Sequence, residues 1–263
     1  MKKFIDYVLG IAGLKISKIS SIDSLLTQTR TCTLELEQLR QDFEVLRIVA
    51  PEARSMCLDF LHKSKSQMHQ DLIALSELGF KKNGFFVEFG ATNGVDISNS
   101  YLMEKEFQWS GILAEPARVW HSELKQNRSV PIETKCVWKE SGQTLKFNET
   151  EIGDLSTIDE FSQKDQYSEE RASGTRYDVE TISLIDLLEL HNAPKVIDYL
   201  SIDTEGSEYE ILKNFDFDRY QFKVITCEHN NTPQRDKIYD LLTRNGYMRK
   251  FEDISKYDDW FVS

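Results

Sequence analysis

The chain is short of positive charge. Its 263 residues include 32 Lys and Arg but 44 Asp and Glu, which gives a formal net charge of -12. Proteins that bind nucleic acid neutralise many phosphates with basic side chains, so this balance argues against a nucleic acid as substrate or partner. An uncharged or glycosidic small molecule fits the composition better.

Cysteine pairs and secretion signals are also missing. The four cysteines form no C-x-x-C pair, and no cleavage pattern for secretion follows the amino terminus. We therefore expect reduced thiols in a cytoplasmic protein. Cys136 and Cys227 stand in apolar, strand-like surroundings, which is typical of small buried side chains rather than of nucleophiles.

Glycine is too scarce for a dinucleotide fingerprint in residues 85–94. This apolar run contains Glu88 and ends in a turn bracketed by Gly90 and Gly94, as in a buried strand that enters a ligand-binding loop and then a helix. The G-x-G-x-x-G fingerprint requires a third glycine. Glu88 would repel a pyrophosphate but suit a cation, and S-adenosylmethionine carries a sulfonium and an ammonium group.

Three further apolar runs, 110–115, 198–203 and 223–228, have the same form. The acids at or near the ends of the four runs are Glu88, Glu115, Asp203 and Glu228. Because parallel strands meet their ligands at a shared carboxyl edge, we expect these acids to converge on one crevice. Glu115 follows the glycine loop by about twenty residues, where a carboxylate typically accepts the ribose hydroxyls of an adenosine.

Five separated blocks of sequence occur in a recognisable order. They are 66–71 (SQMHQD), 87–94 (VEFGATNG), 99–102 (NSYL), 111–116 (GILAEP) and 198–208 (DYLSIDTEGSE). In these blocks the chain resembles the FkbM family of S-adenosylmethionine-dependent methyltransferases, over about residues 64–263. The resemblance implies an α/β class I methyltransferase fold, Rossmann-like with a seven-stranded, mostly parallel sheet. It also implies methyl transfer to a hydroxyl, commonly on a sugar, glycan, glycolipid or related natural product.

The resemblance divides the chain and implies its cofactor contacts. Residues 61–263 are expected to form the methyltransferase domain, and residues 1–60 an N-terminal helical extension with a coiled-coil segment at 22–50. The residues expected to bind S-adenosylmethionine are Gln67, Asp71, Glu88, Gly90, Ala91, Thr92, Asn93, Gly94, Asn99, Glu115, Pro116 and Val137.

Polar residues at two neighbouring strand ends suit the chemistry of the acceptor. The sulfonium already activates the methyl group, so the protein must align the acceptor oxygen and remove its proton. Asp203 ends one strand, and Glu228, His229 and Asn230 end the next. This arrangement is similar to that of catechol O-methyltransferase, which holds a divalent metal at those two strand ends.

Two versions of proton removal are open. In one, Asp203, Glu228 and Asn230 bind Mg²⁺ or another divalent cation, which lowers the pKa of the acceptor hydroxyl and leaves His229 as base. In the other, no metal is present and Asp203 or His229 acts directly.

Two other functional classes compete with a methyltransferase. A nicotinamide-dependent oxidoreductase shares the strand, loop and ribose acid, but its pyrophosphate would meet Glu88 without the third glycine. A non-catalytic scaffold would keep only a vestigial fold joined to a coiled coil. The intact acids at the strand ends argue against such decay.

Residues 22–50 carry a heptad seam. Apolar or small side chains recur at three-four spacing: Ile22, Leu25, Thr29, Cys32, Leu36, Leu39, Phe43, Leu46 and Ala50. Glu35 with Arg40 and Asp42 with Arg47 suit the g and e′ positions of a parallel pair. The pattern predicts a homo-oligomer, most simply a dimer. A helix that folds back on the catalytic domain is the alternative.

The first twenty residues combine four lysines with an apolar run too short to span a bilayer. They predict an amphipathic helix that either touches a membrane surface or packs on protein. Pro51 predicts a break, followed by two short helices in 52–80.

The remaining pattern predicts short elements. We expect a helix through Leu124, a strand over 132–137, a hairpin over 142–147, a strand over 177–181, a helix over 184–190 and a final antiparallel pair within 246–262. Residues 151–176 show no persistent period, which predicts either a lid or acceptor-recognition loop or a plain mobile excursion.

Overall fold

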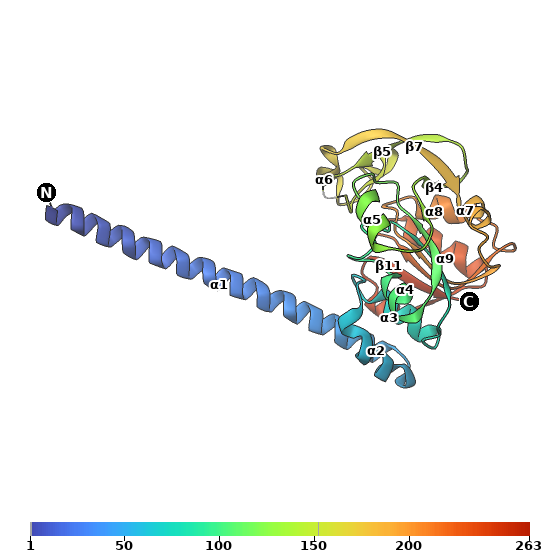
Figure 1. Cartoon of the computed structure of the whole chain (residues 1–263), viewed down its shortest axis with the longest axis horizontal. Helices are drawn as coiled ribbons and strands as arrows, with labels where there is room; N and C mark the ends of the chain where they lie inside the picture. Colours follow the sequence, from blue (N-terminus) through green and yellow to red (C-terminus); the bar gives the residue numbers. More distant parts are fainter. Residues whose placement is uncertain (1, 152) are drawn as a thin grey trace. The chain divides into compact units, whose positions relative to one another are not determined.

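The buried apolar runs of the sequence form a central sheet. In the computed structural model (Figure 1), which describes residues 2–151 and 153–263 and side chains from residue 22 onward, seven strands lie in the order β10–β11–β9–β8–β1–β2–β3. Their bounds are β1 Phe85–Phe89, β2 Ser110–Ala114, β3 Ile132–Glu133, β8 Val196–Ile202, β9 Gln221–Glu228, β10 Met248–Lys250 and β11 Asp258–Val262. The first five are parallel, whereas β11 and β10 are antiparallel. The predicted α/β fold is confirmed, including the final antiparallel pair.

Helices cover both faces of this sheet. Neighbouring residues of a strand point to opposite faces, so Val87 joins one hydrophobic core and Phe86 the other. The first core packs on α7 Leu184–Leu190, α8 Glu208–Lys213 and α9 Gln234–Arg244, and the second on α3 Gln70–Glu77, α4 Tyr101–Phe107 and α5 His121–Asn127. Each fully buried aliphatic or aromatic side chain contributes roughly 1.5–3 kcal/mol, so these two cores account for most of the apolar stabilisation.

A second sheet of four strands has the order β4–β7–β5–β6. Its strands are β4 Cys136–Trp138, β5 Thr144–Glu149, β6 Thr157–Ile158 and β7 Thr175–Ser183. The single strand expected over 132–137 is therefore wrong. Its first half, β3, pairs with β2 in the large sheet, and its second half, β4, pairs with β7 in the small one.

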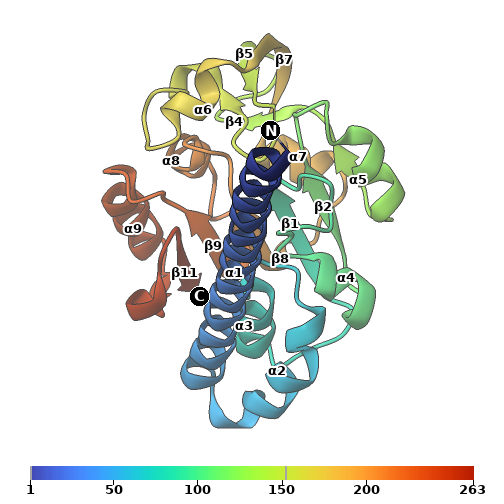
Figure 2. The same cartoon turned by 90° about the vertical axis from the view of Figure 1, so that its left-hand side faces the viewer.

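Residues 151–176 are more regular than their sequence indicates. They contain β6, a 3-10 turn at Asp159–Phe161 and α6 Ser168–Ala172, so the expectation of an irregular segment is wrong. These pieces are too short to show a periodicity. Figure 2 shows α6 and the small sheet together at the top of the view, above β1 and β2.

The amino-terminal helix α1 spans Lys2–Ile48, and its side chains are described from Ile22 onward. The expectation of an amphipathic surface over residues 1–20 therefore lies outside the described side chains. The helix ends before Ala50, which removes the last position of the predicted seam, and a 3-10 turn begins at Pro51 as expected. Two short helices follow, α2 Arg54–Phe60 and α3.

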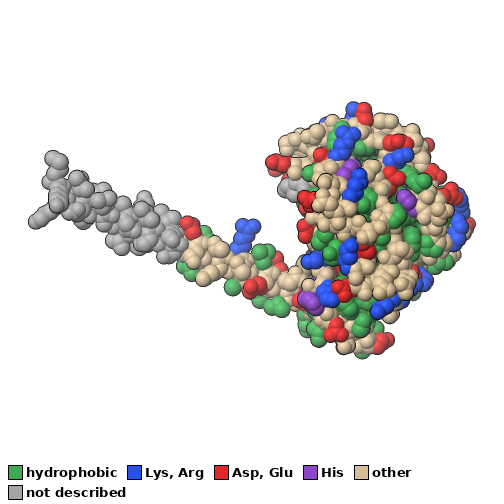
Figure 3. Space-filling view, viewed as in Figure 1, with side chains coloured by type: hydrophobic (Ala, Val, Ile, Leu, Met, Phe, Trp, Pro, Cys, Tyr) green, Lys and Arg blue, Asp and Glu red, His purple; other side chains and the backbone are tan. Residues whose placement is uncertain are grey.

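The chain divides into two units, Met1–Glu44 and Val45–Ser263. In the first unit, large apolar side chains are exposed along the helix (Figure 3): Ile22, Leu25, Leu26, Leu34, Leu36, Leu39 and Phe43. In the second unit, Val45 and Val49 are buried in the core beside α3. No helix in the part of the chain that the structure describes is long and apolar enough to cross a membrane.

Candidate active site

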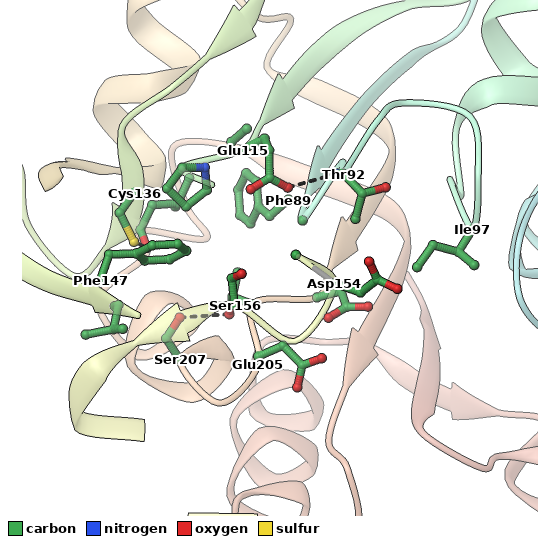
Figure 4. Close-up of a pocket in the computed structure, with 18 residues that line it drawn as sticks. Phe89, Thr92, Ile97, Glu115, Cys136, Phe147, Asp154, Ser156, Glu205 and Ser207 are labelled. Carbon is green, nitrogen blue, oxygen red and sulfur yellow. Dashed lines mark hydrogen bonds between the residues drawn. The ribbon is translucent and has the colours of Figure 1, made fainter. Parts of the chain in front are cut away.

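The parallel strands end in register at one wall of a pocket. Phe89, the last residue of β1, lies beside Ala114 of β2 and Ile202 of β8. The residues that follow these three are Gly90, Glu115 and Asp203, and all three line a cavity of about 600 Å³ that includes its open mouth (Figure 4). Side chains of the small sheet and of residues 153–158 line the cavity opposite the strand ends.

Gly90 and Gly94 are required by the close packing of the loop. Both have positive φ, +73° and +80°. A Cβ on Gly90 would lie 2.1 Å from the carbonyl oxygen of Asp203, and a Cβ on Gly94 would lie 2.6 Å from the side chains of Leu124 and Arg128. Only glycine fits at these two positions, as the sequence predicts.

Glu115 is a buried carboxylate that points toward the pocket (Figure 4). It accepts hydrogen bonds from the backbone N–H groups of Thr92 at 2.8 Å and Ala117 at 2.7 Å. Burial raises the pKa of Glu115 to about 7, and the charges of Glu149 and Asp154 add to this, while the two backbone bonds oppose it. The residue thus ties the glycine loop to the end of β2.

Glu88 does not join the crevice, so that part of the predicted convergence is wrong. It lies inside β1, and its carboxylate accepts hydrogen bonds from Ser98 Oγ, from the Asn99 N–H at 2.6 Å and from Ser100 Oγ. Arg128 lies 3.7 Å away. These bonds fix the conformation of residues 98–100, and the helix expected after the glycine loop follows as α4 from Tyr101.

The other expected cofactor residues fall into two groups. Those that line the pocket are Gly90, Thr92, Glu115, Pro116 and Val137. Those that do not are Gln67, Asp71, Glu88, Ala91, Asn93, Gly94 and Asn99. Gln67 is exposed, and Asp71 accepts a hydrogen bond from Ser64 Oγ. Asn99 donates to Ser201 Oγ at 2.9 Å.

Three carboxylates meet at the ends of β8 and β9. Oxygen atoms of Asp203, Glu205 and Glu228 lie within 4.8 Å of one another. Burial, and then the charges of Glu205 and Asp258, raise the pKa of Asp203 well above its ordinary value. Burial and the charge of Asp203 do the same to the pKa of Glu228, whose Oε2 has no hydrogen-bond partner among the described residues. The cluster therefore favours a bound cation or a shared proton.

Glu205 is the functional side chain that the sequence reasoning missed. It lines the pocket and has φ of 57°, followed by Gly206 at 118°. Asn230, the expected third metal ligand, donates through its amide nitrogen to Glu205 Oε2 at 3.1 Å. A signal was present in the sequence, because a glycine four residues after a strand end indicates a tight turn, and loops at the carboxyl edge of parallel strands are where ligands bind.

His229 is buried at the end of β9 but does not line the pocket. Its Nδ1 accepts a hydrogen bond from the Asn231 N–H, which leaves Nε2 to donate to Ser255 Oγ at 3.0 Å. Burial lowers the pKa of His229 to about 4, and Arg235 and Arg249 act in the same direction against Asp259. Both ring nitrogens are thus engaged within the protein.

A family model described as the methyltransferase FkbM domain matches residues 88–249, more than half of the chain. The search of curated proteins found no match.

Among solved structures, the chain is similar to a precorrin-6y C5,15-methyltransferase from Geobacter metallireducens GS-15, with 13% identity over 73% of this chain and 88% of that one, and a TM-score of 0.40. It is also similar to a ribosomal protein L11 methylase from Lactobacillus delbrueckii subsp. bulgaricus, with 8% identity over 73% and 75% of the two chains and a TM-score of 0.38.

Proposed function

Because the chain belongs to the FkbM methyltransferase family, we propose that it transfers the methyl group of S-adenosylmethionine to a hydroxyl of a sugar, glycan, glycolipid or related natural product. One observation carries the proposal: Gly90, Glu115 and Asp203 line a single pocket at the carboxyl edge of the parallel strands. Such a transfer requires three parts: a backbone that the donor can approach, an acid that binds its ribose and an acid that takes the proton of the acceptor.

In this proposal Glu115 accepts the ribose hydroxyls of the donor, and Pro116, Val137 and Phe147 surround its adenine. The methionine end then extends over the loop that begins at Gly90 and toward Asp203. The sulfonium and ammonium charges of the donor suit an acidic pocket, because opposite charges attract more strongly away from water.

Asp203 is the residue proposed to take the proton. The acceptor oxygen attacks the methyl carbon, the C–S bond electrons return to sulfur, and the hydroxyl proton passes to the Asp203 carboxylate. Burial raises the pKa of Asp203, so the carboxyl is a stronger base in the fraction of molecules in which it is ionised. His229, with both ring nitrogens engaged, is proposed to fix the turn at the end of β9 instead of removing the proton.

The charge of the pocket bears on the acceptor. Its described lining includes four acids, Glu115, Asp154, Asp203 and Glu205, and no Lys, Arg or His. A phosphate or carboxylate on the acceptor would be repelled there, so an uncharged hydroxyl compound is favoured over a nucleotide-linked sugar.

A metal-assisted version stays open within this proposal. Asp203, Glu205 and Glu228 supply the carboxylate oxygens that Mg²⁺ prefers, and the unpartnered Glu228 Oε2 leaves room for such a ligand role. A bound divalent cation would lower the pKa of the acceptor hydroxyl. Turnover that survives EDTA, in protein shown by elemental analysis to hold no metal, would eliminate this version and leave Asp203 as a direct base.

Donor binding is the decisive test. Isothermal calorimetry should detect binding of S-adenosylmethionine and no binding of NAD⁺. The loop lacks the third glycine that a dinucleotide site requires, and the pocket lining offers no cationic side chain to the pyrophosphate. A protein that binds neither would be the non-catalytic scaffold, and one that prefers NAD⁺ would be an oxidoreductase. Mass spectrometry of glycans and glycolipids from cells with and without the gene would then identify the acceptor.

A further inference from the structure

Arg171, on α6, is a fully buried guanidinium outside the strand ends. Its Nη1 donates to both carboxylate oxygens of Asp165 at 2.7 Å, and its Nη2 donates to Glu205 Oε2 at 2.7 Å. Its Nε donates to the carbonyl oxygen of Leu155 at 2.7 Å. One side chain therefore joins three distant points of the chain.

Two of these points belong to neighbouring segments that both line the pocket. Leu155 belongs to the roof segment, residues 153–158, of which Gly153, Asp154, Ser156 and Ile158 line the cavity. Glu205 belongs to the loop of residues 204–207, of which Thr204, Glu205 and Ser207 line it. Figure 4 shows Asp154 and Ser156 across the cavity from Glu115 and close to Glu205.

Further contacts join the same two segments. Thr157 Oγ1 donates to the carbonyl oxygen of Glu205 at 2.8 Å. Phe161, just beyond the roof, lies against Gly206, where an added Cβ would come within 3.2 Å of its ring. The roof is thus bonded to the loop and does not merely lie over it.

The loop conformation needs such support. Glu205 is a non-glycine residue in the left-handed region, with φ of 57°. Side chains adopt this conformation where surrounding contacts enforce it. The carboxylate of Glu205 is held by Arg171 and Asn230, and its carbonyl by Thr157.

From these contacts we infer that Arg171 is a positioning residue of the methyl-donor pocket. Its planar guanidinium fixes the roof segment against loop 204–207, so that the pocket has a fixed upper wall. The identity of the donor rests on the proposed function, whereas the position of the roof does not.

Three variants test this role. Arg171→Gln removes the charge and the fork, and Arg171→Lys keeps the charge but replaces the planar fork and its Nε donor with a single ammonium nitrogen. Arg176→Gln is the matched control. Arg176 pairs at 2.8 Å with Asp159, the residue that follows the roof segment, but it is exposed to solvent. Circular dichroism at the working temperature establishes that each variant is folded.

The first measurement needs no ligand. Hydrogen exchange of the amides in 153–158 should be at least about tenfold faster in both Arg171 variants than in wild type, and unchanged in Arg176→Gln. Equal exchange in Arg171→Gln and wild type would overturn the inference, whatever the protein binds.

The second measurement uses S-adenosylmethionine. Calorimetry should give a Kd raised at least about fivefold in both Arg171 variants, with Arg176→Gln within about twofold of wild type. Full recovery by Arg171→Lys would mean that charge alone matters, and an unchanged Kd in Arg171→Gln with only a lower Tm would mean a purely structural role. Either result overturns the positioning role. Faster exchange in a protein whose wild type does not bind the donor would refute the proposed function but not the fixed roof.

Discussion

The floor and the roof of the pocket are held in different ways. The floor, at the ends of β1, β2 and β8, rests on paired strands whose register lines up Gly90, Glu115 and Asp203. The roof, residues 153–158, is paired with β5 through β6 Thr157–Ile158, and the rest of it is held by polar side chains such as Arg171. Backbone pairing along whole strands holds the floor, whereas loss of one side chain should loosen residues 153–156. The fold of the floor should therefore tolerate loss of one polar side chain better than the fold of the roof does.

The largest effect should come from the floor. Asp203→Asn should lower turnover by about 10²–10⁴-fold, because the variant cannot accept the acceptor proton. Its donor Kd should stay near that of wild type. The measurement is transfer of radiolabelled methyl to the identified acceptor.

His229→Ala is the partner experiment. The sequence predicts that it abolishes transfer, but the internal hydrogen bonds of His229 now predict a smaller loss than that of Asp203→Asn. A larger loss in His229→Ala would return the role of base to the histidine.

The next effect concerns Glu115. Glu115→Ala removes charge-assisted hydrogen bonds worth about 1.5–3 kcal/mol each, so donor affinity should fall by roughly 10- to 100-fold. Glu115→Gln keeps one acceptor oxygen for the loop N–H groups and separates loss of ligand contact from loss of loop support. Calorimetry that finds wild-type affinity in both variants would remove Glu115 from the ribose site.

Of the four acids predicted to converge, Glu115 and Asp203 line the pocket, Glu228 lies beside them in the carboxylate cluster, and the prediction is wrong for Glu88. Glu115 and Asp203 each follow the last residue of a strand and so point into the ligand edge. Glu88 is the second-last residue of β1, and its side chain therefore lies on a sheet face, where it binds residues 98–100. The acidic pattern predicts the edge, but a shift of one or two residues decides which way a side chain points.

The roof was beyond sequence reasoning for a physical reason. Long apolar runs in the sequence predict the strands of the large sheet. In contrast, β6 has two residues and α6 has five, which is too short for a recognisable pattern. Arg171 and Glu205 are 34 positions apart and belong to no repeating pattern. Buried ion pairs of this kind depend on tertiary geometry that propensity and period do not encode.

A smaller effect, on stability, is expected from truncating the amino-terminal helix. Deleting residues 2–44 should leave a folded monomer that binds the donor, because Val45 and Val49 stay in place. Deleting residues 2–50 removes these two buried side chains and should lower the free energy of unfolding by roughly 1.5–3 kcal/mol for each. Chemical denaturation compares the two truncations.

Light scattering tests the predicted coiled coil in the same proteins. The exposed Leu36, Leu39 and Phe43 should supply most of the association, because exposed ion pairs contribute only about 0–1 kcal/mol. A monomeric full-length protein at micromolar concentration, or an oligomer after deletion of 2–44, would contradict the coiled-coil prediction.

The smallest expected effect is a change in the pH dependence of donor affinity, because Asp154 in the roof influences the pKa of Glu115 in the floor. Donor affinity should weaken as pH falls below about 7, because Glu115 then gains a proton and loses its acceptor strength. Asp154→Asn removes a roof charge that raises the pKa of Glu115, so the midpoint should move to lower pH. If calorimetry finds the same pH midpoint of donor affinity in Asp154→Asn as in wild type, the charge of Asp154 does not influence the titration of Glu115.

Stability without ligand should change in the opposite sense. The folded pKa of Glu115 lies above its unfolded value of 4.5, so the protonated form stabilises the fold below pH 4.5 and that contribution is lost as pH rises through about 7. The pKa of Glu205, raised to about 8, acts in the same direction. The Tm of the ligand-free protein should therefore fall between pH 5 and 8, by roughly 2–4 °C for each kcal/mol lost.

The buried guanidinium also restricts how this protein can evolve. Arg171 pairs with both Asp165 and Glu205, so replacing the arginine leaves two buried carboxylates without a counter-charge. Such an intermediate is destabilised by about 3–5 kcal/mol, which is a large part of the stability of an ordinary domain. Descendants therefore cannot lose Arg171 before its two partners without passing through a poorly folded ancestor. New acceptor preferences are therefore expected to arise from substitutions at the neighbouring Asp154 and Ser156, while Arg171, Asp165 and Glu205 are retained together.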